Sequence, residues 1–229
     1  MRLVVLAVVS ILVLAGCQVI APGTSQLQSF KSWEAANKLT DIEKANIKSS
    51  CDGEGKGTEQ CTQLAEIQGR ACFNLVKQDT AAKAACPAFT PTTQSRLQCT
   101  VNDFELALAG KQFIQDQVEE VTEMHARALY CHANTLTKQA GLPEAQQAAR
   151  ELASLPANPE RDQLAASAAL YQANNNQASQ SDRCNAARSA VSLANRGLQN
   201  NPPSDLQQGL SATREHAITV AGTLSNCSV

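Results

Sequence analysis

The chain has few aromatic side chains, and this scarcity already narrows the choice of fold. Phenylalanine, tryptophan and tyrosine together make up 3% of its 229 residues. Strands favour aromatic and β-branched side chains, so the composition argues against a β-sandwich or a β-barrel. Alanines are frequent instead. We therefore expect an all-α fold in which helices approach one another closely through small side chains.

A marked excess of charge of either sign is also missing. The sequence has 19 basic and 21 acidic residues, a formal net charge of −2. A nucleic-acid-binding surface requires clustered positive charge, which this balance does not supply. We therefore expect no nucleic acid among the partners.

The familiar catalytic and metal-binding motifs are absent too. The sequence contains no Gly-x-Ser-x-Gly, no Ser-x-x-Lys, no His-Glu-x-x-His and no Cys-x-x-Cys. An active site assembled from distant residues remains compatible with these absences. The sequence nevertheless favours a protein that is not an enzyme and needs neither a cofactor nor a metal.

The longest apolar run is short and stands at the N-terminus. Arg2 provides a positive start, residues 3–14 are apolar except for Ser10, and the small residues Ala15 and Gly16 follow. A membrane-spanning helix needs about 20 apolar residues, so this run is too short to cross a bilayer comfortably. Its three-part order is typical of a secretory signal peptide, which we place at residues 1–16.

The end of this signal resembles the lipobox of bacterial prolipoproteins. The resemblance rests on Leu14-Ala15-Gly16-Cys17. In that family the signal is removed before the cysteine, which carries acyl chains, so the resemblance implies a lipid anchor on Cys17. Two or three acyl chains hold a protein stably at a membrane. Gln18, where an aspartate would favour the inner membrane, implies an outer-membrane lipoprotein facing the periplasm. An ordinary signal peptide is the alternative.

The remaining cysteines are eight, an even number. In an exported chain this count predicts four disulfides. Our strongest pairing is Cys184–Cys227, from two apolar faces of a C-terminal helical hairpin. By adjacency in the sequence, the other three pairs are Cys51–Cys61, Cys72–Cys86 and Cys99–Cys131. The rival interpretation, a structural zinc site, lacks paired ligands at the usual spacing.

We divide the mature chain into an acylated tether, residues 17–29, and one helical domain, residues 30–229. The tether is polar and contains Pro22-Gly23, a composition typical of a flexible linker. Within the domain, apolar residues recur at steps of three and four. The expected helices include 40–49, a helix beginning at Thr58, a long helix over 112–139, 144–155, 160–173 opened by Asn158-Pro159, and a final pair that carries Cys184 and Cys227.

Part of this pattern resembles a tetratricopeptide repeat. Leu164-x-x-Ser167-Ala168-x-x-Tyr171 is similar to the first helix of that unit, and Ala190, Ala194, Gly197 and Pro202 are similar to its second helix and closing proline. Eight or more extra residues separate these halves, which departs from the 34-residue unit. The resemblance implies a short array of stacked helix pairs. A disulfide-stapled helical bundle of another kind is the alternative.

Three groups of polar residues are candidate sites. Asp116, Glu119, Glu120 and Glu123 form an acidic stripe, which we interpret as a solvated helix face. His125 and His132 stand one heptad apart on an apolar seam, where packed and hydrogen-bonded core residues are more common than ligands. The glycine-rich stretch 52–57 lacks phosphate-loop and calcium-loop spacing and is interpreted as a surface loop.

These features together favour a non-enzymatic scaffold. We expect a lipid-anchored helical module that binds a protein or peptide in a groove between helices, in a role such as the assembly of an envelope machine. The alternative is a binding module for a small molecule, a lipid or a cell-wall fragment. A hydrolase or a redox enzyme is a third class, and its sign would be a free reactive cysteine or a buried pair of carboxylates.

Overall fold

The computed structural model describes residues 24–229 except 82–83, 111–112 and 114. The described part is all-helical and contains no β-strand, which confirms the predicted fold class. The elements are α1 (Thr24–Ala35), α2 (Leu39–Lys44), α3 (Lys48–Cys51), the short 3-10 helix η1 (Gly53–Gly55), α4 (Glu59–Gln78), α5 (Pro91–Ala109), α6 (Gln115–Ala133), α7 (Lys138–Ser154), α8 (Pro159–Ala173), α9 (Gln180–Gln199) and α10 (Ser204–Gly222). None of these helices is both long enough and apolar enough to cross a membrane.

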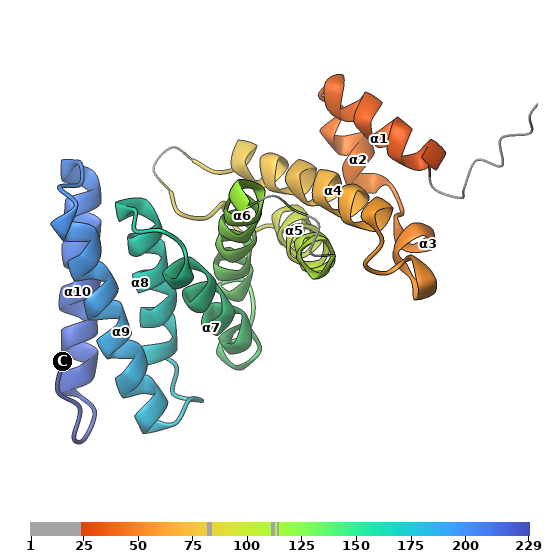
Figure 1. Cartoon of the computed structure of the whole chain (residues 1–229). Coiled ribbons are helices and arrows are strands. Elements are labelled where there is room, and N and C mark those ends of the chain that lie inside the picture. Colours follow the sequence, from red (N-terminus) through yellow and green to blue (C-terminus); the bar gives the residue numbers. More distant parts are fainter. Residues whose placement is uncertain (1–23, 82–83, 111–112, 114) are drawn as a thin grey trace, which may run out of the picture.

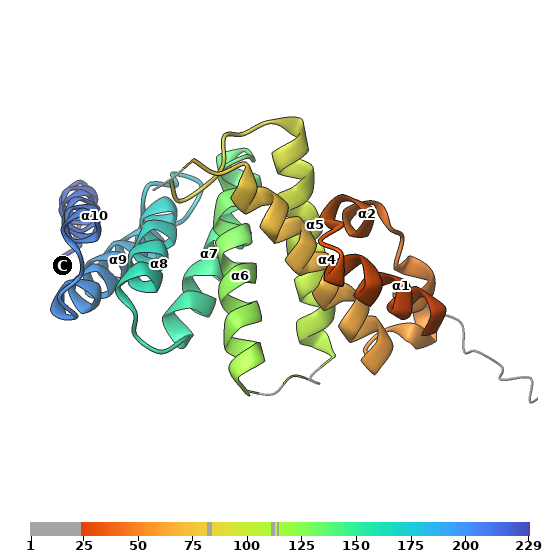
Figure 2. The same cartoon turned by 90° about the horizontal axis from the view of Figure 1, so that it is seen from above.

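The helices stack one after another into an elongated array. Both views place α1–α3 at one end, α9 and α10 at the other, and α6 near the middle (Figures 1 and 2). Each long helix packs mainly against its neighbours in the sequence, and α8 also contacts α10. The main core runs from α4 to α10, and a smaller core at the N-terminal end joins α1–α4.

Small side chains allow the central helices to come close together. In α8, Ala165, Ala166, Ala168 and Ala169 are all buried, since α7, α9 and α10 surround this helix. Between α4 and α5 the contact depends on Gly69. A Cβ atom at Gly69 would lie 2.7 Å from the ring of the buried Phe104. The expected close approach of helices is therefore present.

Side-chain caps start α8 and α4, and the sequence predicts the first of them. Asn158 precedes Pro159 and its side chain accepts hydrogen bonds from the backbone N–H groups of Glu160 and Arg161. Thr58 likewise accepts a hydrogen bond from the N–H of Cys61 at the start of α4. These starts lie where the sequence places them because a cap satisfies backbone donors locally, without any distant partner.

The start of the domain differs from the prediction. Helix α1 begins at Thr24 and so includes residues 24–29, which we had assigned to the tether. The reason is that Leu27, Phe30 and Trp33 lie on one side of this helix and join the N-terminal core, where Phe30 is fully buried. The signal peptide, Cys17 and the first part of the tether lie outside the described residues.

The first predicted helix, 40–49, is instead two short helices, α2 and α3. A tertiary contact explains the interruption between them. The buried side-chain amide of Gln68, on α4, donates hydrogen bonds to the carbonyls of Ile42 at 2.7 Å and Ala45 at 2.8 Å. These bonds satisfy carbonyl groups that a continuous helix would have satisfied itself.

The long helix predicted over 112–139 is also wrong. Helix α6 ends at Ala133, the chain turns, and Thr137 caps α7 by accepting a hydrogen bond from the N–H of Ala140. Gly141 and Pro143 therefore both lie inside α7. The reason is close packing: a Cβ atom at Gly141 would lie 2.4 Å from the carbonyl oxygen of Ala133.

Four disulfides hold the array together. The predicted pairs Cys51–Cys61 and Cys184–Cys227 are present. Helix α10 ends at Gly222, before Cys227, so the chain beyond the helix carries this cysteine back toward α9. The predicted pairs Cys72–Cys86 and Cys99–Cys131 are wrong, because the structure joins Cys72 to Cys99 and Cys86 to Cys131. The Cys86–Cys131 bridge passes over α5 and joins the segment after α4 to α6.

Candidate functional site

A groove follows one side of the array. It consists of three hollows with volumes of 570, 580 and 450 Å³, which we call the N-terminal, central and C-terminal hollows. Arg70 lines both the first and the second. Ala84, Ala85, Arg127 and Glu160 line both the second and the third, so neighbouring hollows adjoin one another.

Alternate helices form this groove. The described lining residues come mainly from α4, α6, α8 and α10, with α1 at the N-terminal hollow and Leu97 of α5 at the central one, while α7 and α9 contribute none. Thr80, Ala84, Ala85 and Pro87, between α4 and α5, also line the central hollow. In stacked helix pairs, one helix of each pair faces the same side, and such arrays present extended binding surfaces there. The order of helices therefore produces a continuous surface from residues far apart in the sequence.

Among the described residues that line the groove, acidic side chains outnumber basic ones by seven to four. The acidic residues are Glu34, Glu59, Glu66, Glu120, Glu123, Glu160 and Asp205, and the basic residues are Lys31, Arg70, Lys77 and Arg127. Phe73, on α4, is a half-buried aromatic side chain in the central hollow, and Asn74 beside it is exposed. The groove thus combines an aromatic contact with a net negative charge.

Ion pairs inside the groove connect its alternate helices. Arg70, on α4, binds both carboxylate oxygens of Glu120, on α6, at 2.8 and 3.0 Å, and these hydrogen bonds lower the pKa of Glu120. Glu123, also on α6, accepts hydrogen bonds from Arg127 and from Arg161 on α8. Bidentate pairs fix geometry as well as charge. The network therefore holds α4, α6 and α8 in register along the groove.

The predicted acidic stripe is only partly a solvated face. Glu120 and Glu123 belong to this ion-pair network, whereas the side chain of Asp116 lies outside the described residues. The stretch 52–57 is mostly exposed, as expected for a surface loop, and contains η1. The spacing of four between Glu123 and Arg127 predicts their pair within α6. Spacing did not reveal Arg70 and Arg161, because these partners come from α4 and α8.

Both predicted seam histidines are buried and hydrogen-bonded. His125 Nδ1 lies 2.9 Å from Glu151 Oε2, and His132 Nδ1 lies 2.8 Å from Glu144 Oε2. The two histidines are seven residues apart on α6, and the two glutamates are seven residues apart on α7. These pairs therefore tie α6 to α7, which agrees with the interpretation of the histidines as hydrogen-bonded core residues.

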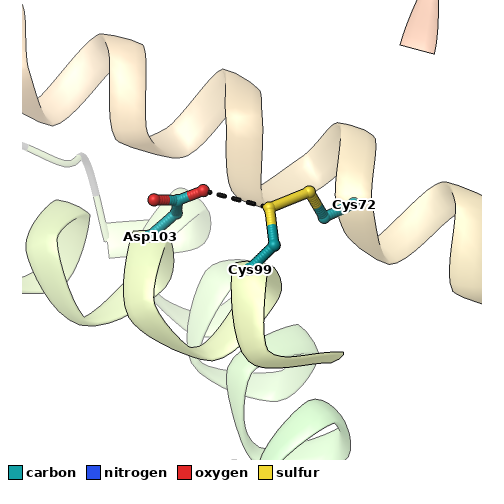
Figure 3. A group of neighbouring side chains, drawn as sticks. All are labelled: Cys72, Cys99 and Asp103. Atoms are coloured by element: carbon teal, nitrogen blue, oxygen red, sulfur yellow. Dashed lines mark hydrogen bonds between the residues drawn. A yellow bond between two sulfur atoms is a disulfide. The ribbon is translucent and has the colours of Figure 1, made fainter. Parts of the chain in front are cut away.

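A different polar cluster was not predicted from the sequence. It consists of the Cys72–Cys99 disulfide, between α4 and α5, and Asp103, one turn after Cys99 (Figure 3). Asp103 Oδ2 lies 3.3 Å from Cys99 Sγ, and the two sulfurs and a carboxylate oxygen lie within 4.8 Å of one another. The spacing of four between Cys99 and Asp103 was the available signal, since such residues share a helix face.

The carboxyl group of Asp103 is buried, with 8% of the residue exposed. This burial raises its pKa to about 7, because the charged form loses its hydration. A disulfide sulfur carries no hydrogen, so in this contact the protonated carboxyl group is the donor. Metal ligation by cysteine requires a thiolate, and both sulfurs here are consumed in the disulfide.

Comparisons with known proteins give no family assignment: the chain matches no protein-family model, no curated protein and no solved structure.

Proposed function

We propose that the chain is a lipid-anchored periplasmic scaffold that binds a basic, extended segment of another envelope protein. The observation that carries this proposal is the groove, which alternate helices form along the array and in which acidic side chains exceed basic ones. An extended segment fits a long groove better than a compact ligand does. Positive charge on that segment complements the carboxylates and favours association with this partner over acidic ones.

Two further features support this role. The eight described cysteines all form disulfides, as expected in an oxidising compartment such as the periplasm. The lipobox resemblance at Leu14–Cys17 would attach the chain to a membrane, and residues between Cys17 and α1 would connect the anchor to the array. The array would then present its groove beside the membrane surface.

The anchor is tested by mass spectrometry of the intact protein extracted from membranes without reduction. We expect an N-terminus at Cys17 that carries acyl mass, together with no free thiols. A Cys17→Ser variant should lack this mass and leave the membrane fraction. An unmodified N-terminus on the wild-type protein would contradict the anchor. A free thiol at a cysteine other than Cys72 or Cys99 would contradict the braced scaffold.

The groove is tested by changing its charge at Asn74. This residue is exposed in the central hollow, and no hydrogen bond of its side chain contributes to the fold described above. We expect Asn74→Glu to increase, and Asn74→Arg to decrease, recovery of the partner crosslinked in native envelopes. The difference should be at least threefold, since one charge next to a complementary surface changes binding by about 1 kcal/mol at low ionic strength.

The matched control is Asn102, an exposed asparagine on α5 that lines none of the three hollows. The same two substitutions there should leave recovery unchanged. Equal effects at both positions would indicate a response to net charge alone. Recovery of an acidic partner, or of none, would overturn the proposal. In the latter case, a rise in melting temperature with lipids or muropeptides would identify the small-ligand alternative.

A further inference from the structure

The Cys72–Cys99 bridge differs from the other disulfides in its surroundings. Its two sulfurs and an Asp103 carboxylate oxygen form the one group of metal-ligand-type atoms within 4.8 Å of one another found in the described part of the chain (Figure 3). Cys72 is fully buried on α4, and Cys99 is partly exposed on α5. The Cys99 side of the bridge is therefore the side from which a thiol can approach, while the Cys72 side is closed to water.

Asp103 has no ion-pair partner in the described structure. In the described part of the chain its polar contact is with Cys99 Sγ, at 3.3 Å, and burial raises its pKa. A buried carboxyl group without a charged partner lowers stability, so packing gives no reason for its presence. Its position beside a disulfide, which can exchange with thiols, is suited to proton transfer during that exchange.

We propose that Cys72–Cys99 is a redox-active disulfide that exchanges with the dithiol of a partner oxidoreductase, with the Asp103 carboxyl group as the proton donor and acceptor. This proposal is independent of the groove and its basic partner. It assigns an exchange reaction to a bridge that otherwise would only connect α4 to α5.

The exchange balances in two steps. A partner thiolate attacks Cys99 Sγ, the S–S bond to Cys72 breaks, and the Cys72 sulfur leaves with the electron pair and takes the proton of Asp103. The second thiol of the partner then loses its proton to the Asp103 carboxylate and attacks the partner sulfur of the mixed disulfide. Cys99 leaves as a thiolate and takes this proton from Asp103, whose oxygen lies 3.3 Å from Cys99 Sγ. The partner dithiol is oxidised to a disulfide, and Cys72 and Cys99 are reduced to thiols.

The ionisation of Asp103 suits this task. Its pKa of about 7 means that both the acid and the carboxylate are populated near neutral pH. A proton donor and acceptor is most effective when its pKa lies near the working pH. The same carboxyl group can therefore serve both directions of the exchange.

The test uses dithiothreitol as the dithiol, acting on the folded full-length protein. Thiols are trapped at intervals and the four bridges are followed by peptide mapping. We expect Cys72–Cys99 to open at least tenfold faster than Cys184–Cys227, which also joins a buried to a partly exposed cysteine and so serves as the internal control. Asp103→Asn should slow the opening of Cys72–Cys99 about a hundredfold and leave the control bridge unchanged.

The pH profile separates this role from a purely structural one. Expressed per dithiothreitol thiolate, the wild-type rate at Cys72–Cys99 should fall as the pH rises through about 7, because the proton of Asp103 is lost. The profile of Asp103→Asn should be flat. If burial of Asp103 acted only by loosening the fold, the wild-type rate would instead rise with pH. That rise, or equal rates at the two bridges, would overturn the proposal.

Discussion

The wild-type protein should lose stability as the pH rises from about 4 to about 7, and the Asp103→Asn variant should not show this loss. The Asp103 pKa is about 7 in the folded protein, against 3.8 for an ordinary aspartate. Between these values the unfolded chain has released the proton and the folded chain has kept it. The folded state binds more protons, so the free energy of unfolding falls with rising pH.

The size of this effect follows from the shift. A pKa difference of about three units corresponds to about 4 kcal/mol between the ends of the pH window. From pH 5 to pH 8 we expect a change of about 3 kcal/mol in the free energy of unfolding, in the wild-type protein relative to Asp103→Asn. Urea unfolding of both proteins at each pH, with the disulfides intact, measures this difference.

A matched control is Asp52→Asn, at an exposed aspartate. Because this side chain keeps its contact with water on folding, the substitution should produce no comparable pH-dependent difference. The prediction fails if Asp103→Asn changes stability by the same amount at pH 5 and pH 8. In that case Asp103 would be ionised in the fold over this whole range, and its proposed role as a proton donor would fail with it.

Substituting Gly141 by alanine should destabilise the protein by about 2–3 kcal/mol, although alanine is the better helix former by about 1 kcal/mol. The new Cβ atom would lie 2.4 Å from the carbonyl oxygen of Ala133 and 2.6 Å from the hydroxyl of Tyr171. The carbonyl oxygen belongs to the backbone at the end of α6 and cannot rotate away. Helices α6 and α7 must therefore separate.

The Tyr171 hydroxyl couples the Gly141 position to α8. It donates a hydrogen bond of 3.2 Å to the same Ala133 carbonyl, and α8 is thereby joined to the turn between α6 and α7. Gly141→Ala and Tyr171→Phe should therefore be non-additive when they are combined. The control is Gly222→Ala, where no atom lies within 4 Å of the new Cβ. Equal melting temperatures for Gly141→Ala and Gly222→Ala would refute the close contact.

Two of the four disulfides can be predicted from the local sequence, and two cannot. Cys51 and Cys61 are ten residues apart, so adjacency in the sequence predicted this pair. Cys184 and Cys227 belong to the C-terminal helical hairpin, and the apolar faces of its helices predicted that pair. Adjacency failed for the other four cysteines. Loop entropy favours near partners only slightly, and the packing of helix faces outweighs that preference.

Helix faces explain the two observed pairs that adjacency missed. Cys72 lies on the side of α4 that packs against α5, which brings it to Cys99. Cys86, in the segment between α4 and α5, pairs instead with Cys131 near the end of α6, whose sulfur lies 3.4 Å from the carbonyl of Ala85. These neighbours are 27 and 45 residues apart in the sequence, beyond the range of any local signal.

By itself, the sequence determined the helical class, the even set of eight cysteines and helix starts such as Asn158-Pro159, because composition and capping act within a few residues. Only the tertiary structure decided the split of α2 from α3, the turn between Ala133 and Lys138, the groove along alternate helices and the burial of Asp103 beside a disulfide. Each of these depends on which faces of distant helices meet. Gln68, Gly141 and Asp103 have their roles because of neighbours that lie on other helices, and periodicity within one helix does not identify those neighbours.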